Sequence, residues 1–359
     1  MLRPQDVGHR VVVRKIIGVG GDRPLYTDLL GLLAELTETE LTVLTRNGPR
    51  RVALADVHRS KLVPPTANPA ARRAADRESA AVAELERAAN QTWAAPVQQR
   101  LGDWLLRAAD GWTGRANSAL PLGDPGCPLP AAVDAVTAWY AERGLPAQVN
   151  VPLPAAAEVA GELARRGWRS GPLVLVQTVP LADLLARTAG PGEDPAGGSP
   201  DGSPGGAGGS PDGGPTVRLD HAPSPEWLAL VAARKSAGDP LPAAAHRLLT
   251  DAPQVRFAHL YADGQLVAIA RGAVDADHRW CQIALLEVQP AARRRGHATR
   301  VLRAVGRWAA DELAAPTAFL QVEQHNPATA LYARLGFTTH HVYLPWQPAV
   351  SDEPPDGAC

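Results

Sequence analysis

The chain of 359 residues is poor in cysteine, in lysine and in long apolar runs. Its three cysteines, Cys127, Cys281 and Cys359, lie far apart, so they have neither the spacing of a disulfide framework nor that of a zinc site. No apolar run approaches the roughly 20 residues of a membrane span, and the first residues lack the pattern of a signal peptide. We therefore expect no metal, no membrane contact and a reducing, cytoplasmic location.

An excess of one charge is missing as well. The 36 basic and 37 acidic residues give a formal net charge of -1, which argues against a general nucleic-acid binder. Glycine and proline, in contrast, make up most of the segment from Gly190 to Pro215. Such a segment buries too little apolar surface to offset its conformational entropy, so we predict a flexible linker over residues 187–215. The chain is long enough for two or three domains, and this linker sets off the last of them.

Two sequence motifs in the C-terminal part indicate the function. The first, Leu285–Thr299, runs from an apolar strand through an arginine-rich turn into a helix start, and the second, Asn326–Phe337, contains a short helix. A helix N-terminus has unpaired N–H groups and a partial positive charge. The small residues in Arg293-x-x-Gly296-x-Ala298 let an anion approach the main chain closely. The turn therefore predicts a binding site for a diphosphate.

The remaining elements of this part follow from apolar alternation and turn signals. We predict strands at 216–220, 255–261, 265–273, 280–288, 318–323 and 338–344, and helices at 225–235, 242–250, 300–313 and 326–335.

The two motifs, together with the predicted order of strands and helices, resemble the acetyl-CoA-binding and C-terminal motifs of the GCN5-related N-acetyltransferase (GNAT) family. The resemblance implies an α/β (α+β) fold, a mixed sheet flanked by helices, for a catalytic domain over residues 216–347. It implies acetyl-CoA as the co-substrate. The acceptor of the acetyl group would be a primary amine, either a small molecule or a protein lysine or N-terminus.

The resemblance also implies roles for residues. Tyr332 stands where family members commonly carry the general acid for the departing thiolate, the alternative being a core aromatic of an amphipathic helix. Val288 would align the pantetheine arm through its backbone, and Asn326 would lie beside the same arm. The cofactor-binding residues implied in this way are Leu286, Val288, Arg293, Arg294, Arg295, Gly296, His297, Ala298, Thr299 and Asn326.

Two carboxylates are candidates for the general base. Some relatives have glutamate where this chain has Gln321, whose amide cannot accept a proton at neutral pH. Glu323 falls on the same strand face two residues later, and Glu287 lies on the central predicted strand. Either serves as the base, directly or through water, or else binds the substrate ammonium or stabilises the fold.

Residues 84–186 can be aligned without gaps to the C-terminal part at a constant offset. In this alignment Trp139 corresponds to Trp308 and Gly167 to Gly336. We infer a degenerate GNAT-like half, which resembles the tandem arrangement of some family members. Its counterpart of the arginine-rich turn begins at Asp124-Pro125. An acidic residue and prolines without N–H groups make a poor diphosphate site.

Residues 1–63 are predicted as short strands, with a hairpin signal at Arg46–Pro49. They resemble a small SH3-like β-barrel, which either contacts a protein or only packs against the rest. Residues 348–359 are expected to be a disordered tail.

Two hypotheses of function follow. In the first, the chain is an active acetyl-CoA-dependent N-acetyltransferase. In the second, it is an acyl-CoA-sensing or protein-docking regulatory module with little turnover. The whole chain resembles actinobacterial GNAT proteins with an N-terminal SH3-like domain, some of them described as histone-acetyltransferase-like.

Overall fold

The computed structural model describes residues 2–20, 23–45, 48–64, 68–189, 215–236 and 238–349. Of the linker predicted at 187–215, residues 190–214 lie outside these ranges, while 187 and 188 belong to the last turn of a helix. Of the tail predicted at 348–359, residues 350–359 lie outside them. The contacts divide the chain into two units. The first unit comprises Met1–Glu84, Val97–Leu175 and His341–Cys359, and the second comprises Leu85–Pro96 and Val176–His340. Each unit therefore combines stretches that are distant in sequence, and the domain limits given above stay predictions.

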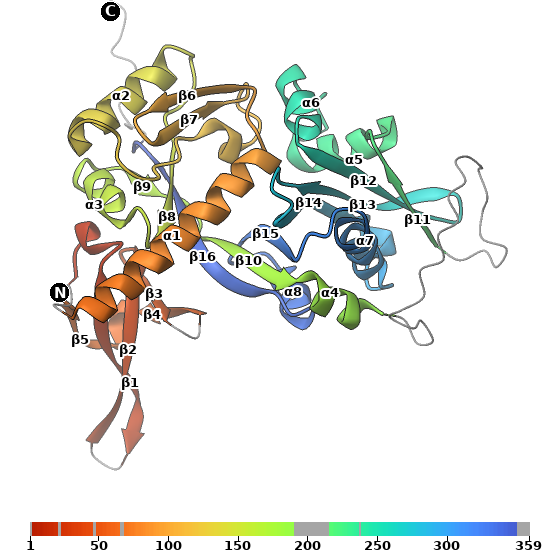
Figure 1. Ribbon diagram of the computed structural model, residues 1–359. Helices are drawn as coiled ribbons and strands as arrows, with labels where there is room; N and C mark the ends of the chain where they lie inside the picture. Colours follow the sequence, from red (N-terminus) through yellow and green to blue (C-terminus); the bar gives the residue numbers. More distant parts are fainter. Residues whose placement is uncertain are drawn as a thin grey trace, which may run out of the picture. The chain divides into compact units, whose positions relative to one another are not determined.

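The first unit begins with a five-stranded antiparallel sheet in the order β4-β3-β2-β1-β5 (Figure 1). Its elements are η1 (Pro4–Asp6), β1 (Arg10–Gly20), β2 (Arg23–Leu36), β3 (Glu40–Thr45), β4 (Gly48–Ala53), η2 (Leu54–Asp56) and β5 (Val57–Leu62). Val11 and Val13 of β1 and Leu33 of β2 are fully buried, as alternation on a half-buried strand requires. Within the described residues the ladder ends at β4 and β5 without joining them. The closed SH3-like barrel is therefore not observed, and two residues of the predicted hairpin turn, 46 and 47, lie outside the described ranges.

The rest of the first unit contains a short ladder in which strand β16 pairs with both β8 and β9. Its elements are β6 (Val97–Leu101), β7 (Trp104–Ala108), η3 (Gly114–Asn117), α2 (Leu129–Ala141), β8 (Val149–Leu153), α3 (Ala157–Arg165) and β9 (Arg169–Ser170), and residues 341–347 of β16 (Thr338–Gln347) pair with β8 and β9. Helix α2 contains Trp139 and helix α3 ends two residues before Gly167, the two positions that the internal repeat aligns. Helix α1 (Pro69–Thr92) forms because alanine, arginine and glutamate are strong helix formers.

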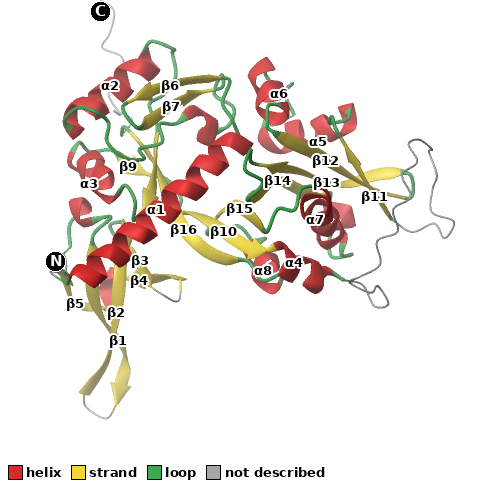
Figure 2. Ribbon diagram, in the orientation of Figure 1, coloured by secondary structure: helices red, strands yellow, loops and turns green. Residues whose placement is uncertain are grey.

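The second unit is a mixed sheet in the order β11-β12-β13-β14-β15-β10 with helices around it (Figure 2). Its strands are β11 (Thr216–Asp220), β12 (Gln254–Ala262), β13 (Gln265–Val274), β14 (Trp280–Val288), β15 (Thr317–Glu323) and most of β10 (Val174–Pro180). Its helices are α4 (Leu181–Thr188), α5 (Pro225–Lys235), α6 (Ala243–Thr250), η4 (Pro290–Ala292), α7 (His297–Arg307), the π-helical turn η5 (Trp308–Glu312) and α8 (Thr329–Arg334). Helix α7 packs on β12, β13 and β14 through Val301, Leu302 and Val305, which form its apolar stripe. None of the helices within the described ranges is long and apolar enough to cross a membrane.

A buried arginine joins three elements of the second unit. Arg271 of β13 is 0% exposed, and its Nε donates to the Leu249 carbonyl at 2.7 Å while a terminal nitrogen donates to the Thr92 carbonyl at 2.9 Å. Both carbonyls belong to last turns of helices, α6 and α1, where the backbone has unpaired acceptors and a partial negative charge. The guanidinium thereby satisfies carbonyls at two helix ends.

We expect Arg271→Met to lower the free energy of unfolding by about 2 to 5 kcal/mol, because it leaves buried carbonyls without donors. Urea unfolding of the full chain measures this change. Arg218→Met, which removes an exposed ion pair with Asp220, is the control and should change stability by less than about 0.5 kcal/mol. Equal stability of the two variants would contradict the assigned role.

Candidate active site

Strand β14 is irregular where the predicted cofactor residues lie. Its pairing with β13 shifts between the pairs Arg271/Ala284 and Ile269/Glu287, and Leu285 takes a left-handed φ of 53° at this bulge. On its other side, the described ladder with β15 comprises only Trp280–Gln282 opposite Thr317–Phe319. Beyond Gln282 the sheet therefore leaves β14 backbone groups on this side without strand partners, which an extended ligand can use. Leu286 and Val288 are half-buried in this segment.

The turn after β14 leads directly into α7. Arg294 and Gly296 have positive φ values of 63° and 78°, and Gly296 is the residue before the first helical residue, His297. A Cβ atom built on Gly296 would meet no atom within 4 Å, so open space lies beside the turn. The first N–H groups of the helix, from His297 to Thr299, have no partner within the helix. Open space beside unpaired N–H groups fits a bound diphosphate.

Two arginines hold the carboxylate of Glu287 at the end of β14. A terminal nitrogen of Arg293 lies 3.2 Å from Oε1, and Nε of Arg234 on α5 lies 3.3 Å from Oε2. Nε of Arg293 also donates to the Val288 carbonyl at 3.0 Å. The second predicted catalytic carboxylate, Glu323, is exposed at the end of β15.

Tyr332 lies on α8 with 8% of its surface exposed, and its ring contacts Phe337 edge-on at 5.7 Å between centroids. Burial, and to a smaller extent the nearby Glu287 carboxylate, raises the pKa of Tyr332 to about 12. The hydroxyl is therefore protonated at neutral pH. Asn326 precedes α8, and its Oδ1 accepts from the backbone N–H of Ala328 at 2.9 Å while its own N–H donates to the Glu323 carbonyl at 3.0 Å.

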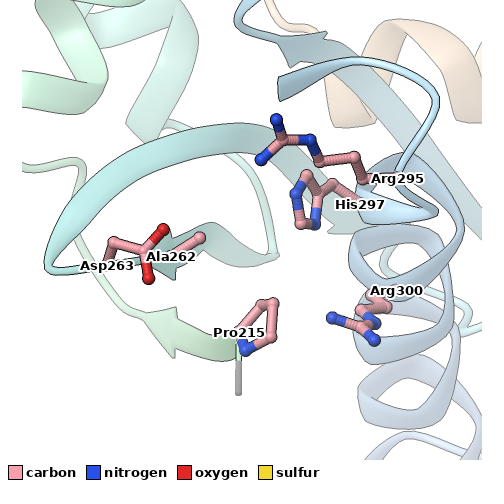
Figure 3. Close-up of a pocket in the computed structure, with 6 residues that line it drawn as sticks. All are labelled: Pro215, Ala262, Asp263, Arg295, His297 and Arg300. Carbon is pink, nitrogen blue, oxygen red and sulfur yellow. The ribbon is translucent and has the colours of Figure 1, made fainter. Parts of the chain in front are cut away.

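A pocket of about 230 Å³ lies beside the first turn of α7 (Figure 3). It is lined by Pro215, Ala262, Asp263, Arg295, His297 and Arg300. Figure 3 shows the side chains of Arg300 and His297 directed from α7 towards Pro215 and the β12–β13 turn. His297 is 4% exposed, and its pKa is lowered by burial and by the charges of Arg300 and Arg295. Its imidazole is therefore neutral at neutral pH.

A protein-family model described as the C-terminal region of the probable histone acetyltransferase Rv0428c matches residues 79–181 and 207–344. The chain belongs to this family. The probable histone acetyltransferase Rv0428c of Mycobacterium tuberculosis (strain ATCC 25618 / H37Rv) is 31% identical over 361 residues, which are 95% of this chain and 96% of the relative.

Among solved structures, a GCN5-related N-acetyltransferase from Kribbella flavida covers 75% of this chain and 96% of its own length, with a TM-score of 0.52 and 18% identity. At this identity the likeness shows the fold, which is the mixed α/β GNAT fold. The predicted family is thus confirmed, and the protein is an acetyltransferase of the GNAT type.

Sequence reasoning missed three side chains of this region. Arg234 contacts Glu287 from a helix 53 residues away in sequence, and no local pattern announces that pairing. Asp263 lies between two predicted strands, and no motif marked it as a site residue. Arg300 was detectable, because it follows Gly296 by four residues and so falls on the same side of α7.

Proposed function

We propose that the second unit binds acetyl-CoA and transfers its acetyl group to a primary amine. The observation that carries this proposal is the unpaired side of β14, which continues into the open turn at Gly296. An extended arm can pair with the backbone of Leu286 and Val288, and the diphosphate at its end then meets the N–H groups from Gly296 to Thr299. Arg293, Arg294 and Arg295 add positive charge to the same turn.

For the acceptor we propose the side-chain amine of a protein lysine. The relative of 31% identity is named a probable histone acetyltransferase, and a lysine ammonium fits the exposed carboxylate of Glu323 at the end of β15. A small primary amine is the other acceptor class, and the assay below separates the two.

The proposed chemistry uses three side chains. The amine nitrogen attacks the thioester carbonyl after losing a proton, the carbon–sulfur bond breaks, and the thiolate takes up a proton. We assign the departing amine proton to Glu323, because both oxygens of Glu287 are held by arginines. We assign protonation of the thiolate to Tyr332. Asn326 would position the pantetheine arm.

The direct test is release of CoA thiol from acetyl-CoA by the full chain with lysine peptides and with small amines. Thiol release that depends on a peptide lysine supports the proposal. Tight binding of acetyl-CoA without thiol release with any amine would favour the regulatory hypothesis instead.

We expect calorimetry to show one acetyl-CoA bound per chain. The corresponding turn of the first unit uses its donors internally, since the N–H of Gly126 donates to the Asp124 carboxylate at 2.8 Å. Helix α2 also starts after Pro128 with another proline in its first turn, which removes N–H groups from the helix start. Two equivalents of bound acetyl-CoA would refute the loss of this second site.

We expect Gly296→Glu to weaken CoA binding by at least about 1 to 3 kcal/mol, roughly 5- to 150-fold in Kd. The new side chain enters the open space beside the turn, strains a left-handed backbone and brings a negative charge to the diphosphate. Calorimetry on the folded variant measures the loss. Gly144→Glu is the matched control, because Gly144 also has a positive φ and open space but lies in the first unit.

A further inference from the structure

A buried histidine contacts the start of helix α5. His259 of β12 is 0% exposed. Its Nδ1 lies 3.0 Å from the Phe257 carbonyl oxygen and 3.1 Å from Oδ2 of Asp220, and its Nε2 lies 3.3 Å from the backbone nitrogen of Ser224. Both neighbours of Nδ1 are acceptors, so Nδ1 carries the proton and Nε2 accepts the N–H of Ser224. These contacts require a neutral imidazole in one tautomer.

The charged side chains that act on this imidazole are Asp220 and Arg218 of β11 and Glu226 of α5. Burial is the largest influence and lowers the pKa of His259 below its ordinary value of 6.5, although the two carboxylates and the Phe257 carbonyl raise it. On the same face, the Tyr261 ring stacks at 6.4 Å between centroids, and Arg271 is bound to helix carbonyls.

The other neighbouring elements present apolar residues to this region. Ile269 lies opposite His259 on β13, and α6 buries only alanine and leucine. Helix α7 packs on the other face of the sheet, where Gly272 of β13 faces Val305. The described charges around His259 therefore come from β11, β13 and α5.

Helix α5 connects this histidine to the proposed cofactor site. Ser224 is the N-cap of the helix, and its side chain accepts the N–H of Trp227 at 3.1 Å. In the last turn of the same helix, Arg234 holds the Glu287 carboxylate at the end of β14. A shift of the cap therefore changes the support of the strand end at which we place the pantetheine arm.

Protonation of His259 would disturb the cap directly. The second proton goes to Nε2, where it points at the N–H of Ser224, so a donor faces a donor. The hydrogen bond is lost and a charge stands in a buried place, which costs free energy unless the start of α5 moves away.

We propose that His259 is a positioning residue that holds α5, and through it Arg234, in the binding geometry only while its imidazole is neutral. This inference rests on the proposed function and adds to it a loss of acetyl-CoA affinity in mildly acidic solution. Because the folded protein lowers the pKa of His259, the stabilisation is complete above about pH 6.5 and is lost as the pH falls below that value.

The experiment measures the Kd of acetyl-CoA by calorimetry from about pH 8 to about pH 5 on the full chain and on His259→Gln. Glutamine places an amide oxygen near the position of Nε2, so it accepts the N–H of Ser224 without titrating. The two proteins should bind alike at the alkaline end. Towards the acidic end the affinity of wild type should fall about 5- to 10-fold more than that of the variant, the lower part of the usual range of coupling between sites.

Two further variants test the route and the specificity. Added to Arg234→Gln, the change His259→Gln should not alter the pH profile further, because the link to Glu287 is already cut. His221→Gln is the matched control, since His221 is an exposed histidine in the connection between β11 and α5. It should keep the pH profile of wild type.

Identical pH profiles of wild type and His259→Gln would overturn the inference and leave the proposed function intact, because both proteins would bind acetyl-CoA. Absence of binding at every pH would overturn the proposed function itself. The melting temperature then tests His259 separately, since wild type should lose more stability on acidification than His259→Gln, and an equal loss overturns the inference.

If His259→Gln does not fold, the imidazole resonances of wild type decide, assigned through the backbone of β12. A neutral ring protonated at Nδ1 at about pH 7 supports the inference. A charged ring or the other tautomer overturns it.

Discussion

Tyr332→Phe should lower turnover by about 10²- to 10⁴-fold, the usual effect of removing a general acid. The substitution deletes only the hydroxyl and keeps the ring that packs against Phe337. Affinity for CoA and melting temperature should therefore stay close to those of wild type. The measurement is the rate of CoA-thiol release at saturating acetyl-CoA, together with calorimetry and a thermal melt.

The pH dependence provides a second readout for Tyr332. With a pKa raised to about 12, the hydroxyl keeps its proton throughout the usual assay range and loses it only above that range. Deprotonation of Tyr332 should therefore cause no decline in the rate below about pH 11. Tyr332→Phe should lower the rate at every pH and leave the alkaline limb of the pH–rate profile at the same pH.

Tyr140→Phe is the matched control, since Tyr140 is a buried tyrosine of the first unit whose hydroxyl donates to the Arg107 carbonyl. It should change stability and not turnover. A wild-type rate for Tyr332→Phe would show that Tyr332 only packs the helix and that another group protonates the thiolate.

Glu323→Gln should lower turnover by about 10²- to 10⁴-fold if Glu323 accepts the amine proton, because an amide cannot act as a base. The loss should be smaller at high pH, where more of the amine is already deprotonated. Glu287→Gln is expected to act differently. It removes the partner of Arg234 and Arg293, so the main effect should appear in the affinity for acetyl-CoA.

Kinetics at saturating and at limiting acetyl-CoA distinguish these two variants. Glu312→Gln, an exposed carboxylate paired with Arg256 in the same unit, is the control and should leave both parameters unchanged. The assignment of the base is reversed if Glu287→Gln loses turnover at saturation and Glu323→Gln does not.

Much of the second unit was predictable because its signals are local. The bounds of β11, α5 and β14 agree with the predicted ones. Helix α5 starts after Ser224, whose side chain accepts a hydrogen bond from the N–H of Trp227. A serine followed by a proline predicts such an N-cap. The turn at Gly296 was equally predictable, since Gly296 has to adopt a left-handed φ that few other residues tolerate.

The remaining features depend on contacts that are distant in sequence. Leu285 belongs to a regular apolar run, and only the register against β13 reveals the bulge at this residue. The short ladder between β14 and β15 likewise follows from how the two strands meet, which neither strand encodes alone. Helix α7 begins three residues earlier than predicted, because His297 faces the interior although it is polar.

The division of the chain has a consequence for how the protein is made. The second unit needs residues 85–96 as well as 176–340, and the first unit receives the last strand, β16, which pairs with β8. During synthesis at about 5 to 20 residues per second, the early segments of both units leave the ribosome long before their partners exist. Contacts between such distant segments form slowly, and apolar strands such as β8 stay uncovered in the meantime. We therefore expect nascent chains that stop before His341 to lack the last strand of the first unit and to depend on chaperones. Cleavage at the linker would not yield two independently folding halves, because each unit takes residues from both sides of it.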